Sequence, residues 1–248
     1  MSFKRKIWNK FQHLYGVPSA ADYTEEIIKN NEIEYALDIG CGYFSNLTRF
    51  RSSKLKSIGI DTHEPAIASA KSKNVHDHYI LANIIDASLE DIQDMLESEI
   101  GRRTVDLVTS YGMIEHLPKE DGWKLLKKCD KLSEKYVLID TPNGYVPQGA
   151  EFGNEHQRHL SGWFPNEFRS MAYTVRGNSG TRYLRGYGGR KRIPIPGILL
   201  FDMFLSRVLF SNYFPSHAFN ITATKDVRGV SAIYPNIEDR EKVSDFIL

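Results

Sequence analysis

The chain has few cysteines, no long uninterrupted apolar run and no excess of charge of either sign. Its two cysteines, Cys41 and Cys129, form no C-x-x-C pair and no cluster with histidine, so neither a disulfide framework nor a zinc site is expected. Lysine and arginine number 32 against 31 acidic residues, which excludes a global field that would attract polyanions. We therefore expect no nucleic-acid partner. Apolar residues make up 41% of the chain, which indicates a folded globular protein.

No secretory signal is expected, because the basic residues that open the chain are not followed by an apolar segment. With free thiols, this predicts a cytoplasmic protein. The longest mostly apolar stretch, residues 193–214, is interrupted by prolines, a glycine and charged residues. Its uninterrupted part, 198–210, would form a helix of about 20 Å, shorter than the roughly 30 Å of membrane hydrocarbon. A buried or interfacial helix is predicted there.

Short apolar runs bounded by turn residues alternate with segments of helical periodicity over residues 35–139. The predicted strands are 35–39, 56–61, 79–82, 105–110 and 136–139. The predicted helices between them follow Asn46 and occupy 65–72, 89–98 and 123–132. This alternation is typical of an α/β protein with a doubly wound, mostly parallel sheet covered by helices on both faces.

The flanking segments carry fewer signals. Residues 1–34 are predicted to hold two helices, 3–15 and one that starts at Asp22 or Thr24 and runs to Asn30. Beyond residue 144, a helix at 165–172 and strands at 173–176 and 219–224 are expected. We treat 35–248 as one domain with a basic and apolar helical cap inserted at about 177–217.

The first predicted strand leads into the turn Asp38-Ile39-Gly40-Cys41-Gly42. Two glycines at this position let the backbone approach a ligand at the carboxyl edge of the sheet. The dinucleotide fingerprint G-x-G-x-x-G is incomplete, because Ser45 stands at its last position. A cationic ligand without phosphate is therefore favoured over a pyrophosphate.

Asp61 ends the second predicted strand, 19 residues beyond Gly42. A carboxylate at this place accepts hydrogen bonds from the vicinal hydroxyls of a ribose. The ligand is thus predicted to contain a nucleoside.

These residues, together with Asn83-Ile84 and the segment 111–118 (Tyr-Gly-Met-Ile-Glu-His-Leu-Pro), resemble the class I S-adenosylmethionine-dependent methyltransferases, and among them the type 11 group. The resemblance covers residues 35–144, and more loosely continues to 225. It implies a Rossmann-like sheet of seven strands with the last strand antiparallel. It also implies that S-adenosylmethionine is the cofactor.

The resemblance assigns cofactor contacts residue by residue. Asp38, Gly40 and Gly42 would line the methionine part, Asp61 would hold the ribose, and Asn83 with Ile84 would flank the adenine. The full predicted set of cofactor-binding residues is Asp38, Gly40, Cys41, Gly42, Asp61, Thr62, Asn83, Ile84, Ser110 and Tyr111. Asn83 departs from the aspartate that is common in the family.

Methyl transfer is an in-line displacement, so the protein supplies proximity, orientation and, for a hydroxyl or protonated amine, a base. His159, in the loop after the fifth strand, and His116, after the fourth, are the predicted catalytic residues. No metal is predicted. The alternative is a divalent cation held by Glu115, His116 and His159, by similarity to methyltransferases with a Glu-x-x-Glu-His motif and a distant histidine; Gly112 replaces the first glutamate.

The acceptor is predicted to be a small or lipid-linked, anionic molecule methylated on oxygen or nitrogen. The expectation of an anion rests on seven basic residues without an acid between Glu167 and Asp202: Arg169, Arg176, Arg182, Arg185, Arg190, Lys191 and Arg192. Peripheral membrane contact through 190–214 and a homodimer through the same apolar helix are alternatives to simple core packing. The rival functions are an NAD-dependent oxidoreductase and a methyltransferase-like module that binds without catalysis.

Overall fold

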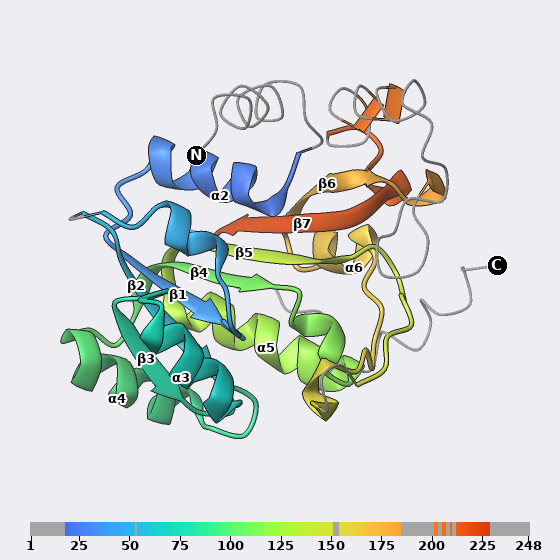
Figure 1. Ribbon diagram of the computed structural model, residues 1–248. Helices are drawn as coiled ribbons and strands as arrows, with labels where there is room; N and C mark the ends of the chain where they lie inside the picture. Colours follow the sequence, from blue (N-terminus) through green and yellow to red (C-terminus); the bar gives the residue numbers. More distant parts are fainter. Residues whose placement is uncertain are drawn as a thin grey trace, which may run out of the picture.

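A computed structural model describes residues 18–52, 54–150, 154–184, 201–202, 205–206, 209 and 212–228. A seven-stranded sheet with the order β3-β2-β1-β4-β5-β7-β6 forms its centre (Figure 1). Its strands are β1 (Tyr35–Ile39), β2 (Lys56–Asp61), β3 (His78–Leu81), β4 (Val105–Tyr111), β5 (Ser133–Pro142), β6 (Thr174–Thr181) and β7 (Ala218–Asp226).

The first five strands pair in parallel, and β7 runs antiparallel between β5 and β6. The order reverses at β1, because β2 lies on one side of it and β4 on the other. In open α/β sheets, ligands bind at the carboxyl ends of the strands at this reversal. The predicted Rossmann-like sheet with an antiparallel last strand is therefore confirmed.

Helices connect the strands. They are α2 (Ala20–Asn30), α3 (Glu64–Ser72), α4 (Leu89–Ile100), α5 (Lys119–Leu132) and the short α6 (Pro165–Arg169). Short 3-10 turns are η1 (Asn46–Arg49), η2 (Ile114–His116), η3 (Glu155–Gln157), η4 (Arg182–Leu184) and η7 (Pro215–His217). Helix α4 shows why these bounds are sharp: Ser88 and Asp91 exchange hydrogen bonds at its start, and Gly101 ends it at a positive φ of 71°.

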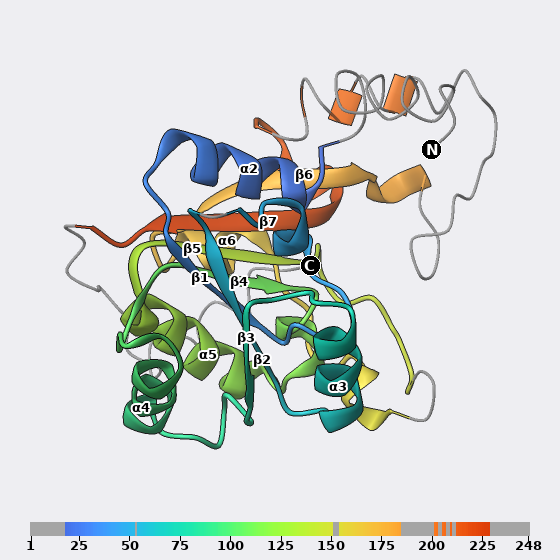
Figure 2. The ribbon, with the colours of Figure 1, turned by 60° about the vertical axis from the view of Figure 1, so that its left-hand side comes forward.

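Two apolar cores lie on opposite faces of the sheet, with α2 on one face and α4 and α5 on the other (Figures 1 and 2). The larger core packs Ile92 and Leu96 of α4 and Leu125 of α5 against alternate residues of the strands. The smaller core packs Tyr23 and Ile27 of α2 against the opposite side chains. The strands are thus buried on both faces, as expected for a parallel sheet.

Several predicted bounds differ from the structure: α5 is 119–132, β5 is 133–142 and α6 is 165–169, where the sequence predicts 123–132, 136–139 and 165–172. Three further differences have a clear physical reason. Helix α2 begins after Ser19, whose N–H donates to the Asp22 carboxylate at 2.8 Å, rather than at Asp22 or Thr24. The helix expected after Asn46 is the single 3-10 turn η1. Strand β6 continues to Thr181, five residues beyond its predicted end at residue 176, because pairing with β7 overrides the weak strand propensity of its glycines.

Several predictions lie outside the described residues: the helix at 3–15, most of the stretch 190–214, and most of the basic residues between Glu167 and Asp202. The cap at about 177–217, the homodimer and the membrane contact therefore stay predictions. Of the helices that the structure describes, none has the length and apolar character needed to cross a bilayer.

Candidate active site

The carboxyl ends of β1, β2, β3 and β4 open into one cavity. It contains about 810 Å³ of atom-free space, which includes the open solvent at its mouth. Of the predicted residues, those that line it are Gly40, Gly42, Asp61, Thr62, Asn83, Ile84 and His116. The cavity therefore joins residues that are far apart in the sequence at the sheet edge where the strand order reverses.

The turn after β1 depends on its two glycines. Gly40 has a φ of +71°, and a Cβ built on it would lie 2.4 Å from Cγ of Met113. Gly42 has a φ of +53° and donates its N–H to Oδ2 of Asp61 at 2.8 Å. A side chain at Gly40 would both strain the backbone and collide with Met113, so this close approach requires glycine.

Asp61 connects the ends of β1 and β2. Its Oδ2 accepts the Gly42 N–H, and its Oδ1 accepts the His63 N–H at 2.8 Å. Each carboxylate oxygen keeps a second lone pair, so the side chain can also accept hydrogen bonds from a ligand in the cavity. This geometry suits a pair of neighbouring hydroxyls.

The loop after β3 forms the opposite wall with Ala82, Asn83 and Ile84. Asn83 is held locally, because its Oδ1 accepts from Ile85 N at 2.9 Å and its Nδ2 donates to Asp86 at 2.7 Å. The resemblance leads us to expect an aspartate at position 83. In this chain Asn83 stands there instead, hydrogen-bonded to the carboxylate of Asp86.

Four other predicted residues lie close to the cavity but are not part of its lining: Asp38, Cys41, Ser110 and Tyr111. Asp38 is 1% exposed, accepts from Thr109 Oγ1 at 3.0 Å, and lies 3.6 Å from Nε2 of His76. Burial raises the pKa of Asp38 to about 7, although hydrogen bonds from Ser45 and Thr109 oppose the shift. The Tyr111 hydroxyl lies 2.7 Å from Thr24 Oγ1 of α2. Direct cofactor contact by these four stays a prediction.

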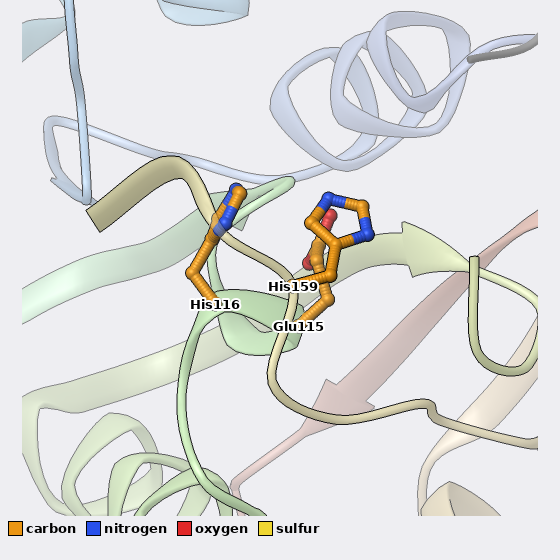
Figure 3. Close-up of side chains that lie close together, drawn as sticks. All are labelled: Glu115, His116 and His159. Carbon is orange, nitrogen blue, oxygen red and sulfur yellow. The ribbon is translucent and has the colours of Figure 1, made fainter. Parts of the chain in front are cut away.

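Glu115, His116 and His159 lie together beside the cavity (Figure 3). Turn η2 carries the first two, and the loop after η3 carries His159. The two imidazole centroids are 4.8 Å apart in a T-shaped arrangement. His116 faces the cavity, whereas His159 is 7% exposed and not among the lining residues.

Backbone carbonyls orient both imidazoles. Nδ1 of His116 lies 3.2 Å from Arg158 O, and Nδ1 of His159 lies 2.6 Å from Val146 O. A carbonyl oxygen only accepts hydrogen bonds, so each Nδ1 carries the hydrogen and each neutral ring keeps its lone pair on Nε2. Burial and the neighbouring His159 lower the pKa of His116, so its ring is neutral near pH 7.

This trio fits a divalent cation. One ligand atom from each residue lies within 4.8 Å of the others, and the donor set of one carboxylate and two imidazoles suits first-row transition metals. An Nδ1–H bound to a carbonyl is also the usual outer support of a metal-ligating histidine. Glu115 is 4% exposed and accepts from Thr141 at 3.0 Å, and burial raises its pKa to about 8.

The geometry agrees with the comparison of the chain with protein families. Residues 37–135 match the family described as "Methyltransferase domain". This stretch includes the turn after β1, Asp61, the Asn83 loop and His116. Residues 37–135 of the chain thus form a methyltransferase domain. This match favours a methyltransferase over the oxidoreductase alternative, and S-adenosylmethionine stays the predicted cofactor.

Solved structures resemble the methyltransferase in fold. A SAM-dependent methyltransferase from Archaeoglobus fulgidus is 16% identical, with a TM-score of 0.50 over 91% of this chain and 100% of that one. A magnesium protoporphyrin IX methyltransferase from Synechocystis PCC 6803 with bound SAM is 12% identical, with a TM-score of 0.46 over 91% and 84%. A small RNA methyltransferase is 17% identical, with a TM-score of 0.49 over 87% of this chain and 25% of that one. No curated protein matches.

The methyltransferase cavity includes residues that sequence analysis did not select. They are mainly Tyr43, His63, Met113, Asn154, His156 and Gln157. Tyr43, His63 and Met113 directly follow strand ends, so their positions carried a usable signal. Asn154, His156 and Gln157, which belong to η3 and its N-cap, had no such signal in the sequence. They reach the cavity through a long loop, and the course of a loop cannot be predicted from apolar periodicity.

Proposed function

We propose that the protein transfers a methyl group from S-adenosylmethionine to an oxygen or nitrogen of a small acceptor that enters the cavity beside His116. The single observation that carries this proposal is the placement of His116. Of the two predicted catalytic residues, His116 is the one that lines the cavity. The Arg158 carbonyl contacts its Nδ1 and not its Nε2.

S-adenosylmethionine supplies the methyl group as part of a sulfonium, from which the methyl leaves sulfur as its bond to the acceptor forms. The protein holds the two reactants in line, which is the main part of its contribution. His116 Nε2 accepts the proton that a hydroxyl or ammonium acceptor loses, and solvent at the mouth later takes it. His159 lies behind His116 and positions its ring.

The test is methyl transfer from labelled S-adenosylmethionine to a panel of phenols, carboxylates and amines. With an acceptor in hand, His116→Gln should lower kcat by about 100- to 10,000-fold, the usual contribution of a general base. The wild-type rate should rise with pH through the lowered pKa of His116 and level off below neutral pH. Unchanged kcat in His116→Gln would contradict this role.

As an alternative to the general base, we propose that Glu115, His116 and His159 together bind a divalent cation, in which case the Nε2 lone pair of His116 binds the metal and does not accept the proton. The observation that favours it is the convergence of three ligand atoms, two of them on imidazoles oriented by carbonyls. A cation held there would bind the acceptor's oxygen and lower its pKa. Cobalt titration followed by visible absorption tests this in the absence of any acceptor. His159→Ala should abolish the spectrum, whereas His78→Ala, which alters an exposed pair with Glu99, should leave it intact.

The charge of the acceptor is a separate prediction. Of the seven basic residues, the structure describes three, and two of these are engaged within the protein: Arg169 donates to Asn166 at 3.0 Å, and Arg176 pairs with Glu26 at 2.7 Å. Anionic, lipid-linked and nucleic-acid acceptors should therefore all be included in the panel. The cytoplasmic location also stays a prediction.

A further inference from the structure

Lys128 contacts the wall of the cofactor cavity from outside. It lies on α5, and its Nζ donates to the backbone oxygens of Ile84 at 2.7 Å and Ile85 at 2.9 Å, and also to that of Ala87. These residues form the loop after β3, of which Asn83 and Ile84 line the cavity. One side chain thus holds a loop that is more than 40 residues away in sequence.

The ammonium group matches this loop in number and charge. It has three hydrogens, and the three carbonyls use all of them. Hydrogen bonds from a charged donor are roughly twice as strong as those between neutral groups. Because the carbonyls must converge on one atom, only a narrow range of loop shapes satisfies them.

The contact also orients Asn83. In a trans peptide the C=O and the following N–H point in opposite directions, so turning Ile84 O toward Lys128 turns Ile85 N–H away from it. That N–H donates to Asn83 Oδ1 at 2.9 Å, and Asn83 O accepts from Ala87 N at 3.0 Å. Both ends of the loop are therefore connected through Asn83 to the ammonium of Lys128.

We propose that Lys128 is a positioning residue for the cofactor, which shapes the Asn83–Ile84 wall to receive the nucleoside. Asp61 ends β2, and this wall follows β3, the neighbouring strand. A ligand whose ribose meets Asp61 and whose amino-acid part meets the Gly40 turn therefore brings its base to Asn83 and Ile84. The inference rests on the cofactor site described above.

The test is calorimetric titration of the full chain with S-adenosylhomocysteine and with adenosine. In Lys128→Met the dissociation constants for both ligands should rise by about 10-fold, because binding must then order the loop. Hydrogen exchange of residues 82–87 in the unliganded protein should become faster, while exchange in β4 and β5 stays unchanged. A residue with a merely structural role would not produce this local pattern.

Lys124→Met is the matched control, since Lys124 lies one turn earlier on α5, is 62% exposed and pairs with Asp121. It removes the same charge and should leave both dissociation constants unchanged. If Lys128→Met does not fold, the same titrations are made with Lys128→Gln. The proposal is overturned if the folded variant binds both ligands as wild type does. A wild-type protein that binds neither ligand would instead refute the cofactor site itself.

Discussion

Asp61 shows how one residue serves the fold and the site together. Its two carboxylate oxygens accept hydrogen bonds from the Gly42 and His63 amides at 2.8 Å each, and the same residue lines the cavity. Structural and ligand-binding roles coincide because a carboxylate offers about four lone-pair directions, more than the two backbone amides occupy.

Replacing Asp61 should therefore strongly weaken cofactor binding. Asp61→Ala removes both ligand hydrogen bonds to a charged group, each worth about 1.5–3 kcal/mol, so S-adenosylhomocysteine should bind at least about 100-fold more weakly. Asp61→Asn should lose nearly as much, because its NH₂ group would face a backbone N–H. Calorimetry measures both, and Asp94→Ala, at an exposed pair with Arg103, is the control. Retained binding in Asp61→Ala would contradict the assigned site.

Among the elements, α5 links the cofactor side of the molecule with the histidine side. Lys128 near its end holds the loop after β3, and Gly122 in its first turn packs against the buried ring of Trp163. Trp163 in turn donates to Ser161, two residues after His159. The position of this helix therefore affects both walls of the site.

Gly122→Ala should destabilise the protein although alanine favours helices. A Cβ at this position would lie 2.2 Å from Cζ2 of Trp163 and 3.2 Å from Ile114, so overpacking is unavoidable. Overpacking of a core costs about 1–3 kcal/mol, which exceeds the gain of about 1 kcal/mol from replacing glycine in a helix. The free energy of unfolding from urea titration should fall. Lys124→Ala, on the exposed face, is the control; a more stable Gly122→Ala would contradict the packing.

At the scale of the molecule, the carboxyl edge of the sheet gathers buried acids. Burial raises the pKa of Asp38 to about 7, that of Asp140 to about 6 and that of Glu115 to about 8. A carboxyl whose pKa is raised on folding stabilises the fold below its unfolded pKa, and the contribution is lost as pH rises through the folded pKa. Burial lowers the pKa of His76 to about 4, and this group acts in the opposite direction only below its ordinary pKa of 6.5.

The free energy of unfolding of the metal-free protein should therefore decrease between pH 6.5 and 8. Asp38 alone should contribute about 1 kcal/mol to this decrease, since one pKa unit corresponds to 1.36 kcal/mol. Asp38→Asn keeps an oxygen for the Thr109 hydroxyl and should flatten the decrease. Urea titrations at several pH values, with EDTA present, measure it. An equal slope in the variant would show that Asp38 does not titrate in this range.

Local patterns in the sequence determined the main strands and the residues at their ends. The predicted strands 35–39 and 56–61 have the same bounds as β1 and β2, and Gly40, Gly42 and Asp61 line the cavity as expected. These predictions are possible because apolar periodicity and turn residues indicate the burial and backbone conformation of a residue within its own element.

Contacts between distant elements were decided only by the tertiary structure. The length of β6 depends on pairing with β7. The course of the loop after β5 decides that His156, but not His159, lines the cavity. The Lys128 contact joins α5 to the loop after β3. No local signal encodes these contacts, because each results from how whole elements pack against the sheet.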